Sequence, residues 1–316
     1  MKKCVFIIPY FGQFNNYFDI YLKTCALNKN FDWIFFTDIR KIEGLPQNIK
    51  FVYTTFEQNK KMFEEKLGFE VKLNSFHKLC EFKPTYGYLY NEYIKDYEYW
   101  GYCDCDLIFG NLEKFLAPLM NEKYDKIFAA GHLTLIKNTD ENNTLFKSND
   151  FYKEVFTSDD NYAFDEDFYD NNIHTIFIEQ NKKIYEKDLS MNTTTSSGRF
   201  IREYYDGNKR KFIKEKYKRA RYFWRDGNIY RYYLENGKIK NEEFIYMHFQ
   251  MRKMRNKIRD INVKQFEILP DRFIESKIDL NQLKKDDFVG AGFTYLYWYD
   301  YYIKKIQRKL KKWLVN

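Results

Sequence analysis

Residues 99–112 read YWGYCDCDLIFGNL, and this stretch decides the fold class that the sequence predicts. Its first half is an apolar run with the length of a buried strand, and the run ends abruptly at Asp104 and Asp106. Two acids at a strand end can jointly bind one divalent cation, and hard carboxylate oxygens suit Mg²⁺ or Mn²⁺. The alternative is a solvated Asp-x-Asp turn, because such short strings also arise by chance.

Strand and helix patterns alternate on both sides of this stretch. Short apolar runs predict further strands over residues 5–9, 33–36, 49–53 and 126–136. Helices are predicted over residues 17–27, 57–67 and 75–94, the last interrupted at Pro84. Alternating strands and helices indicate an α/β fold with a mostly parallel, Rossmann-like sheet and helices on both faces. A nucleotide is expected to bind at the carboxyl ends of the strands.

The composition excludes several protein classes. The 316 residues are 44% hydrophobic, 21% aromatic and 31% charged, which rules out collagen, coiled coils and low-complexity disorder. The five cysteines are odd in number and never spaced C-x-x-C, so neither a zinc finger nor a disulfide framework is predicted. The sequence lacks the run of about 18 apolar residues that a transmembrane helix needs. We therefore expect a cytoplasmic protein.

The net charge of +8 is unevenly distributed. Residues 199–225 hold eleven Lys/Arg against three acids, residues 301–316 hold six Lys/Arg and no acid, and the rest of the chain is acidic. We divide the chain into a nucleotide-binding and catalytic core over residues 1–200 and a smaller basic, mainly helical part over residues 201–316 that completes the site. Because no Gly/Pro-rich linker separates them, we expect the two parts to pack together.

The last residues predict an amphipathic helix. Six cations cover most of its surface, and apolar residues recur in steps of four, three, four and three at Tyr299, Ile303, Ile306, Leu310 and Trp313. This pattern is typical of a helix lying on an anionic membrane, so we expect peripheral association with the inner face of the cell membrane. The alternative is an ordinary helix packed on the domain.

An acidic stretch, FDEDFYD over residues 164–170, is a candidate for catalysis. Asp165 and Glu166 are the preferred catalytic residues, because a carboxylate can act as a base or stabilise developing positive charge. Asp165 can also bind acceptor hydroxyls. The alternative is an acidic helix start. His132 follows Gly131 and either faces the acceptor or packs in the interior.

Three further residues have two interpretations each. His248 lies in the apolar run FIYMHFQ and is either a metal ligand or a buried histidine hydrogen-bonded to backbone. Lys78 and Lys83 precede the bend at Pro84 and either neutralise a donor phosphate or are surface cations.

Several motifs, in their order and spacing, resemble a known family. Besides the DCD element these are IIPYFG at 7–12, FFTD at 35–38, FKPTYG at 82–87, GHLTLIKN at 131–138, FDEDFYD at 164–170 and MHFQ at 247–250. Together they resemble the nucleotide-sugar-dependent glycosyltransferases of the GT-A fold, especially bacterial capsule and cell-surface polysaccharide transferases. The resemblance covers about the first 250 residues.

The resemblance implies a donor site that can be carried over position by position. The nucleobase would be held by Pro9, Tyr10 and Phe11, and the base or ribose by Asp38 with Thr37 beside it. The DCD element, Asp104, Cys105 and Asp106, would bind the ribose and the metal-bound diphosphate. His248 would complete the metal shell formed by Asp104 and Asp106.

The sequence therefore predicts a metal-dependent hexosyltransferase using Mn²⁺ or Mg²⁺. The expected donor is a nucleotide sugar, by preference a UDP-sugar, and the expected acceptor is a sugar hydroxyl of a surface polysaccharide or lipid-linked glycan. The alternative is a non-enzymatic protein that binds single-stranded nucleic acid through the basic, aromatic segments. That alternative leaves the DCD element and the acidic body unexplained.

Overall fold

The structure is a computed structural model. It describes residues 2–39, 44–194, 198–250 and 252–289, together with Tyr302 and Ile306. Apart from these two residues, the predicted membrane-associating helix lies outside the described residues. None of the helices in the described ranges combines the length and apolarity that a membrane span requires.

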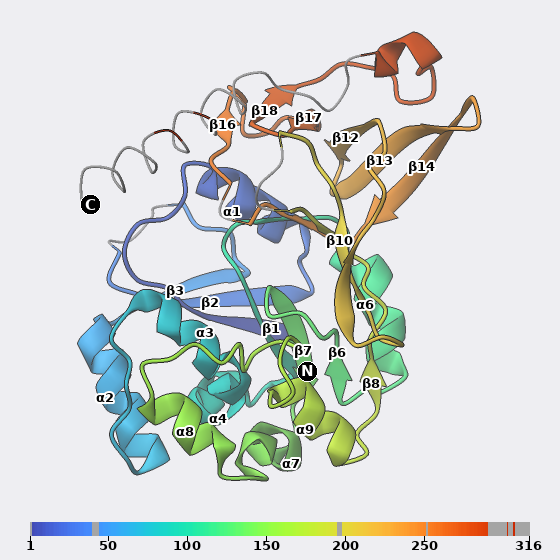
Figure 1. Ribbon diagram of the computed structural model, residues 1–316. Helices are drawn as coiled ribbons and strands as arrows, with labels where there is room; N and C mark the ends of the chain where they lie inside the picture. Colours follow the sequence, from blue (N-terminus) through green and yellow to red (C-terminus); the bar gives the residue numbers. More distant parts are fainter. Residues whose placement is uncertain are drawn as a thin grey trace.

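A seven-stranded, mostly parallel sheet forms the centre of the molecule, in the order β3-β2-β1-β4-β7-β6-β8 (Figure 1). The four strands β1, β2, β3 and β4 run parallel, whereas β7 is antiparallel to both β4 and β6. The bounds are β1 (Lys2–Pro9), β2 (Phe31–Thr37), β3 (Ile49–Tyr53), β4 (Tyr97–Cys103), β6 (Lys126–Ile127), β7 (Leu133–Lys137) and β8 (Ile184–Tyr185). The predicted α/β sheet is confirmed.

Helices cover both faces of this sheet. Successive side chains of β1 point to opposite faces, and those on both faces are apolar. Val5 and Ile7 face one apolar cluster, whereas Phe6 and Ile8 face another on the opposite side. The second cluster contains residues of α1 (Phe18–Leu27) and α6 (Leu112–Asn121). The helices that supply or border the first cluster are α2 (Phe56–Leu67), α3 (Leu79–Phe82), α4 (Tyr86–Leu89), α5 (Asn91–Ile94), α7 (Asp140–Thr144), α8 (Phe151–Thr157) and α9 (Ile173–Glu179).

The segment before β4 is broken at Pro84, as predicted. Short helical pieces succeed one another there: η1 (Phe76–Lys78), α3, η2 (Lys83–Thr85), α4 and α5. Close packing on the sheet requires Gly87, because a Cβ atom at this position would lie 2.4 Å from the Trp100 side chain. The glycine thus lets this segment, which carries Glu81 and Lys83, lie directly against β4.

The single strand expected over residues 126–136 is two strands, β6 and β7. Phe128 between them has φ +74°, a left-handed conformation that interrupts a strand. Residues 128–132 consequently form a loop that brings Gly131 and His132 to the end of β4, where the Asp104 backbone N–H donates to the His132 carbonyl at 3.1 Å. A short helix, η3 (Leu145–Lys147), follows later in this half.

The prediction of a mainly helical C-terminal part is wrong, since this part is rich in β-strands. A six-stranded sheet has the order β14-β13-β12-β17-β18-β16, and β10 pairs with β11 in a separate hairpin. The bounds are β10 (Glu203–Asp206), β11 (Lys211–Lys214), β12 (Ala220–Arg225), β13 (Asn228–Glu235), β14 (Lys238–Phe244), β16 (Arg255–Asn256), β17 (Gln265–Leu269) and β18 (Arg272–Glu275). Among the described residues of this part, η4 (Lys285–Phe288) is the named helical element.

The physical reason lies in two tight turns. Asp226-Gly227 and Asn236-Gly237 connect β12 to β13 and β13 to β14, and all four residues have positive φ. Asp-Gly and Asn-Gly are the pairs favoured in two-residue hairpins. The side chains of β13 are also more and less buried in alternation, which is the strand period.

A three-stranded sheet, β5-β15-β9, joins the two parts of the chain. Its strands are β5 (Leu107–Phe109), β9 (Met191–Asn192) and β15 (Tyr246–His248). Because β15 pairs antiparallel with β5, His248 lies opposite Leu107, the residue that follows Asp106. An apolar cluster shared by α1 and the six-stranded sheet packs the C-terminal part against the core, as expected.

Candidate functional site

Two carboxylates and one imidazole meet just beyond the carboxyl end of β4. His248 Nε2 lies 3.2 Å from Asp106 Oδ1 and 3.6 Å from Asp104 Oδ2. One potential ligand atom from each of these three side chains lies within 4.8 Å of the other two. They form a group that could hold a metal ion, and the predicted set is the one that the structure brings together.

The orientation of His248 fits a metal ligand. Its Nδ1 is 2.9 Å from Asn192 Oδ1, an amide oxygen that can only accept, so Nδ1 carries the hydrogen of the neutral ring. The lone pair of Nε2 then points toward Asp104 and Asp106, the arrangement found where a second residue orients a metal-binding histidine. Burial opposes protonation, but Asp106 outweighs it and raises the pKa of His248. The His248 ring therefore bonds to the Asn192 side chain, whereas the alternative interpretation had it bonded to backbone.

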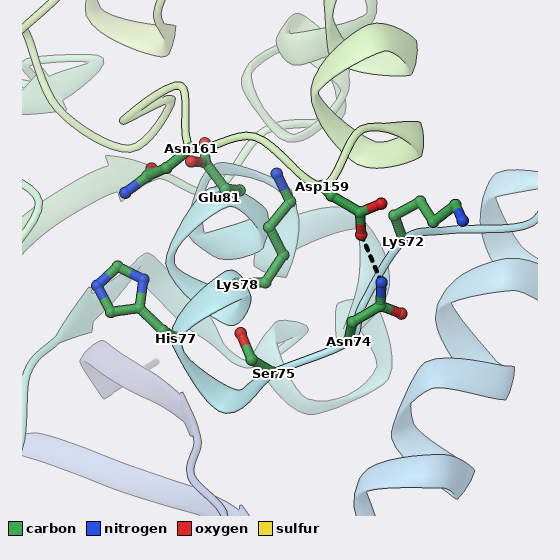
Figure 2. Close-up of a pocket in the computed structure, with 8 residues that line it drawn as sticks. All are labelled: Lys72, Asn74, Ser75, His77, Lys78, Glu81, Asp159 and Asn161. Carbon is green, nitrogen blue, oxygen red and sulfur yellow. Dashed lines mark hydrogen bonds between the residues drawn. The ribbon is translucent and has the colours of Figure 1, made fainter. Parts of the chain in front are cut away.

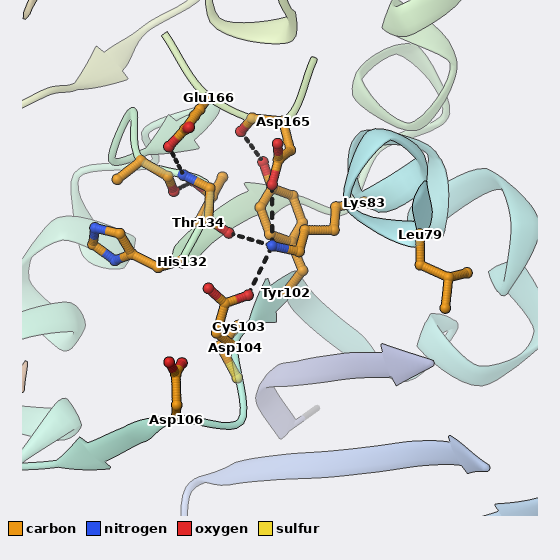
Figure 3. Close-up of polar contacts among 12 residues, drawn as sticks. Leu79, Lys83, Tyr102, Cys103, Asp104, Asp106, His132, Thr134, Asp165 and Glu166 are labelled. Carbon is orange, nitrogen blue, oxygen red and sulfur yellow. Dashed lines mark hydrogen bonds and ion pairs between the residues drawn. The ribbon is translucent and has the colours of Figure 1, made fainter. Parts of the chain in front are cut away.

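Lys83 connects this group of three side chains to Asp165 (Figure 3). Its Nζ lies 2.8 Å from Asp104 Oδ1, 3.0 Å from Asp165 Oδ2 and 2.9 Å from the Gly131 carbonyl. Burial would lower the pKa of the Lys83 ammonium, but the neighbouring anions, led by Asp104, raise it well above its usual value. An ammonium group has three N–H donors, and three acceptors surround it here. Lys83 therefore bridges two carboxylates in this arrangement.

Asp165 and Glu166 lie beside this bridge in the acidic loop, which we define as residues 162–167. Burial raises the pKa of Asp165, although Lys83 opposes the shift. Burial, with Asp165 nearby, raises the pKa of Glu166 to about 7. A Cβ atom at Gly131 would lie 2.4 Å from Asp165 Oδ2, so any other residue at this position would displace the Asp165 carboxylate. The predicted catalytic carboxylates thus adjoin the metal-capable group.

Glu81 is a site residue that sequence reasoning missed. Its carboxylate, 1% exposed, accepts the backbone N–H groups of three consecutive loop residues at 2.7, 3.1 and 2.9 Å: Tyr162, Ala163 and Phe164. A single glutamate in a helical pattern carries no signal of this, since its partners are backbone groups elsewhere in the chain. Glu81 shapes the loop that presents Asp165.

His132 lies inside the site wall. It is 4% exposed, its Nδ1 is 2.8 Å from the Tyr246 hydroxyl, and its ring centre is 4.6 Å from that of His248. Burial lowers the pKa of His132 well below its usual value, and His248 adds to this effect. Its Nε2 has no hydrogen-bond partner among the described residues. Of the two interpretations given above, interior packing agrees with this burial.

The residues expected at the donor lie at the carboxyl ends of β1, β2 and β4, with unequal access to solvent. Tyr10 is partly buried and stacks on Phe14 at 4.6 Å, and Asp38 is exposed. Asp104 and Asp106 are partly buried, and the other residues at these strand ends are buried: Pro9, Phe11, Thr37 and Cys105. Burial raises the pKa of Tyr10 to about 12, so its hydroxyl stays protonated at neutral pH.

Lys78 lies in a pocket that Glu81 also lines, and none of Asp104, Asp106, Asp165 and Glu166 lines this pocket (Figure 2). Its Nζ donates to the Asp160 carbonyl, and burial lowers the pKa of the ammonium. The pocket has a volume of about 100 Å³ and is lined by polar side chains: Lys72, Asn74, Ser75, His77, Lys78, Glu81, Asp159 and Asn161. Glu81 therefore both lines this pocket and accepts hydrogen bonds from the backbone of the acidic loop.

Comparisons with known proteins identify a family. The model of a family of unknown function (DUF6625) matches residues 6–277. No curated protein sequence matches the chain. Among solved structures, the galactosyltransferase LgtC in complex with donor and acceptor sugar analogues is 13% identical, with 60% of this chain and 75% of that chain covered and a TM-score of 0.33. A197 from STIV is 12% identical, with 68% and 95% covered and a TM-score of 0.26. At such TM-scores neither likeness carries an argument about fold or function.

Proposed function

The chain belongs to this family of unknown function, DUF6625, and we propose that it is a metal-dependent glycosyltransferase of the GT-A type. In the proposed reaction a hexosyl group moves from a nucleotide sugar, by preference a UDP-sugar, to a sugar hydroxyl of a surface polysaccharide or lipid-linked glycan. The observation that carries the proposal is the group of Asp104, Asp106 and His248 beyond β4, with Asp165 joined to it through Lys83.

The donor set fits Mn²⁺ or Mg²⁺. Asp104, Asp106 and His248 would hold the cation, with two carboxylates that suit a hard ion and an imidazole oriented by Asn192. Three protein ligands leave coordination positions open for phosphate oxygens. When bound, the cation would neutralise charge that develops on a diphosphate leaving group.

The acidic loop supplies the remaining chemistry of the proposal. The acceptor hydroxyl oxygen forms a bond to the anomeric carbon, the bond from that carbon to the diphosphate breaks, and its electron pair leaves with the diphosphate. The hydroxyl proton passes to a carboxylate, and Glu166 suits this role because a pKa of about 7 lets it take up a proton near neutral pH. Asp165, held by Lys83, would stabilise positive charge at the anomeric carbon.

Substrate-binding regions follow from the same arrangement. We assign the nucleoside to Tyr10 and Asp38, at the carboxyl ends of neighbouring parallel strands. We assign the acceptor sugar to Asp165 in the acidic loop, because its attacking hydroxyl group must reach the neighbouring Glu166. Membrane association through residues 299–313 stays a prediction.

The nucleic-acid alternative loses support in one of its two segments, residues 199–225. Aromatic side chains of the basic segment 199–225 that were expected to stack on bases are largely buried: Tyr205, Tyr222, Phe223 and Trp224. Several of its cations pair with acids, such as Arg221 with Glu267 at 2.7 Å. The basic and aromatic composition of this segment is therefore explained by packing and ion pairs within the fold.

A donor-hydrolysis screen over nucleotide sugars, with and without Mn²⁺, tests the proposal. We expect Mn²⁺-dependent release of a nucleoside diphosphate, lost in Asp104→Asn and in Asp106→Asn. Asp96→Asn is the matched control, because Asp96 is an exposed acid just before the opposite end of β4. Full turnover in either site variant would refute the assignment, and so would the absence of turnover with every donor.

A further inference from the structure

The third carboxylate of the acidic loop, Asp167, is bound by a distant part of the chain. Its side chain is almost completely buried. Oδ1 accepts from Asn172 Nδ2 at 3.0 Å and from Arg210 Nη2 at 2.5 Å, and Oδ2 accepts from Arg210 Nε at 3.0 Å and from the Tyr205 hydroxyl. Burial alone would raise the pKa of Asp167, but these hydrogen bonds, led by those from Arg210, lower it. The group is therefore a carboxylate.

Tyr205 and Arg210 belong to the hairpin of β10 and β11, in the C-terminal part of the chain. Arg210 ends the turn of this hairpin, with φ +47°, and its Nη2 also donates to Thr175 Oγ1 at 2.6 Å. The Tyr205 backbone N–H donates to Asp188 Oδ2 at 2.9 Å. The hairpin is thus fixed to the core at several points besides Asp167.

These contacts hold the acidic loop on both sides of Asp165 and Glu166. Before them, Glu81 accepts the N–H groups of residues 162–164. After them, the Asp167 N–H donates to the Ala129 carbonyl at 3.1 Å, and Arg210 donates two hydrogen bonds to the Asp167 carboxylate. Displacement of Glu166 would require one of these contacts to break.

We propose that the β10–β11 hairpin positions the acidic loop for catalysis, and that Arg210 is the positioning residue that acts through Asp167. The proposal rests on the proposed function, because it needs Glu166 and Asp165 to act on substrate. A bidentate guanidinium suits this task, since it fixes the direction of a carboxylate as well as its distance. A displacement of about 1 Å in a catalytic group can reduce the rate about 100-fold.

Arg210→Met tests this role in the full-length protein. We expect faster hydrogen exchange of the backbone amides of residues 163–169 in the folded variant, and a fall in kcat of about 10- to 100-fold with little change in the donor KM. Arg210→Lys should restore part of the exchange protection and part of kcat, because lysine keeps the positive charge but cannot make the paired hydrogen bonds of a guanidinium. Arg221→Met is the matched control: Arg221 makes the same Nε and Nη2 pair, with Glu267 in the six-stranded sheet.

The control separates positioning from stability. It should lower the melting temperature while leaving loop exchange and kcat close to wild type. If Arg210→Met is folded and its loop exchanges as in the wild type, the proposal fails, and it also fails if Arg221→Met lowers kcat equally. Should Arg210→Met not fold, Tyr205→Phe, which removes one hydroxyl donor to Asp167, takes its place with the same expected changes on a smaller scale. Hydrogen exchange needs no substrate, so the two failures can be told apart. Faster loop exchange in Arg210→Met with an inactive wild type would show that the hairpin holds the loop, but would refute the proposed function and with it the catalytic role of the hairpin. Wild-type loop exchange in Arg210→Met would refute the hairpin proposal itself.

Discussion

Replacement of Glu81 by glutamine should destabilise the protein far more than a change of one atom suggests. Oε1 of Glu81 accepts the N–H groups of Tyr162 and Ala163, and Oε2 accepts that of Phe164. In Glu81→Gln one oxygen becomes an NH₂ group, so at least one backbone N–H faces a donor. A buried donor left unpaired costs about 1–3 kcal/mol.

Glu81→Ala extends the same reasoning. It removes the acceptor of the Tyr162 and Phe164 N–H groups, whereas the Ala163 N–H keeps a second acceptor, Asn161 Oδ1 at 3.1 Å. Because neighbouring effects do not add fully, we expect a loss on the order of 2–5 kcal/mol in the free energy of unfolding. For a chain of this length the melting temperature should fall by roughly 2 °C for each kcal/mol lost. Urea unfolding and thermal melting of the two variants measure these losses directly.

Glu154→Gln is the control for both variants. Glu154 is exposed and accepts from the Tyr162 hydroxyl at 3.2 Å, so it contacts the same loop from the solvent side. Its replacement should change the free energy of unfolding by less than about 0.5 kcal/mol. If Glu81→Gln is as stable as Glu154→Gln, Glu81 does not hold the loop and the reasoning is wrong.

Two further predictions concern buried polar contacts. Asn192→Ala should weaken Mn²⁺ binding about 10- to 100-fold without unfolding the protein, because His248 loses the partner that orients it; unchanged affinity by electron paramagnetic resonance titration would contradict this. Burial lowers the pKa of Lys126 to about 7, so above pH 7 the unfolded chain binds more protons and stability should rise with pH, by up to about 1.4 kcal/mol per unit from this group. Lys126→Met should flatten that rise in urea unfolding between pH 7.5 and 9, and an unaltered slope would exclude Lys126 as its source.

The core of the fold could be predicted because its signals are local. Strands β1, β2 and β4 are largely buried runs, β3 is a short edge strand, and the segments that follow β1 and β3 have helical spacing, so pattern and structure agree. The six-stranded sheet was missed although Asp226-Gly227 and Asn236-Gly237 are strong hairpin signals. The basic and aromatic composition of residues 199–225 suggests a binding surface, whereas Tyr222, Phe223 and Trp224 of β12 are buried in succession because this strand lies inside the sheet, between β13 and β17.

Some residues of the candidate site could likewise be predicted from the sequence, and others could not. Asp104 and Asp106 follow a strand end, and the resemblance pointed to His248, so the metal-capable group could be predicted. The inward direction of Lys83 could not, because it depends on Asp165 and Gly131, which reach it only through the tertiary fold. Glu81 was invisible for a related reason: its partners are backbone N–H groups, which every residue other than proline carries.

The pairing of β15 with β5 has a consequence for biosynthesis. The parallel strands, Asp104 and Asp106 emerge from the ribosome well before His248, which β15 delivers from the C-terminal part. Because domains generally begin to fold from the N-terminal side during synthesis, the sheet can form while the third member of the metal-capable group is still missing. A polypeptide whose translation stops before residue 248 would retain the two acids but lack the histidine. Completion of the metal-capable group is therefore coupled to the translation and pairing of β15.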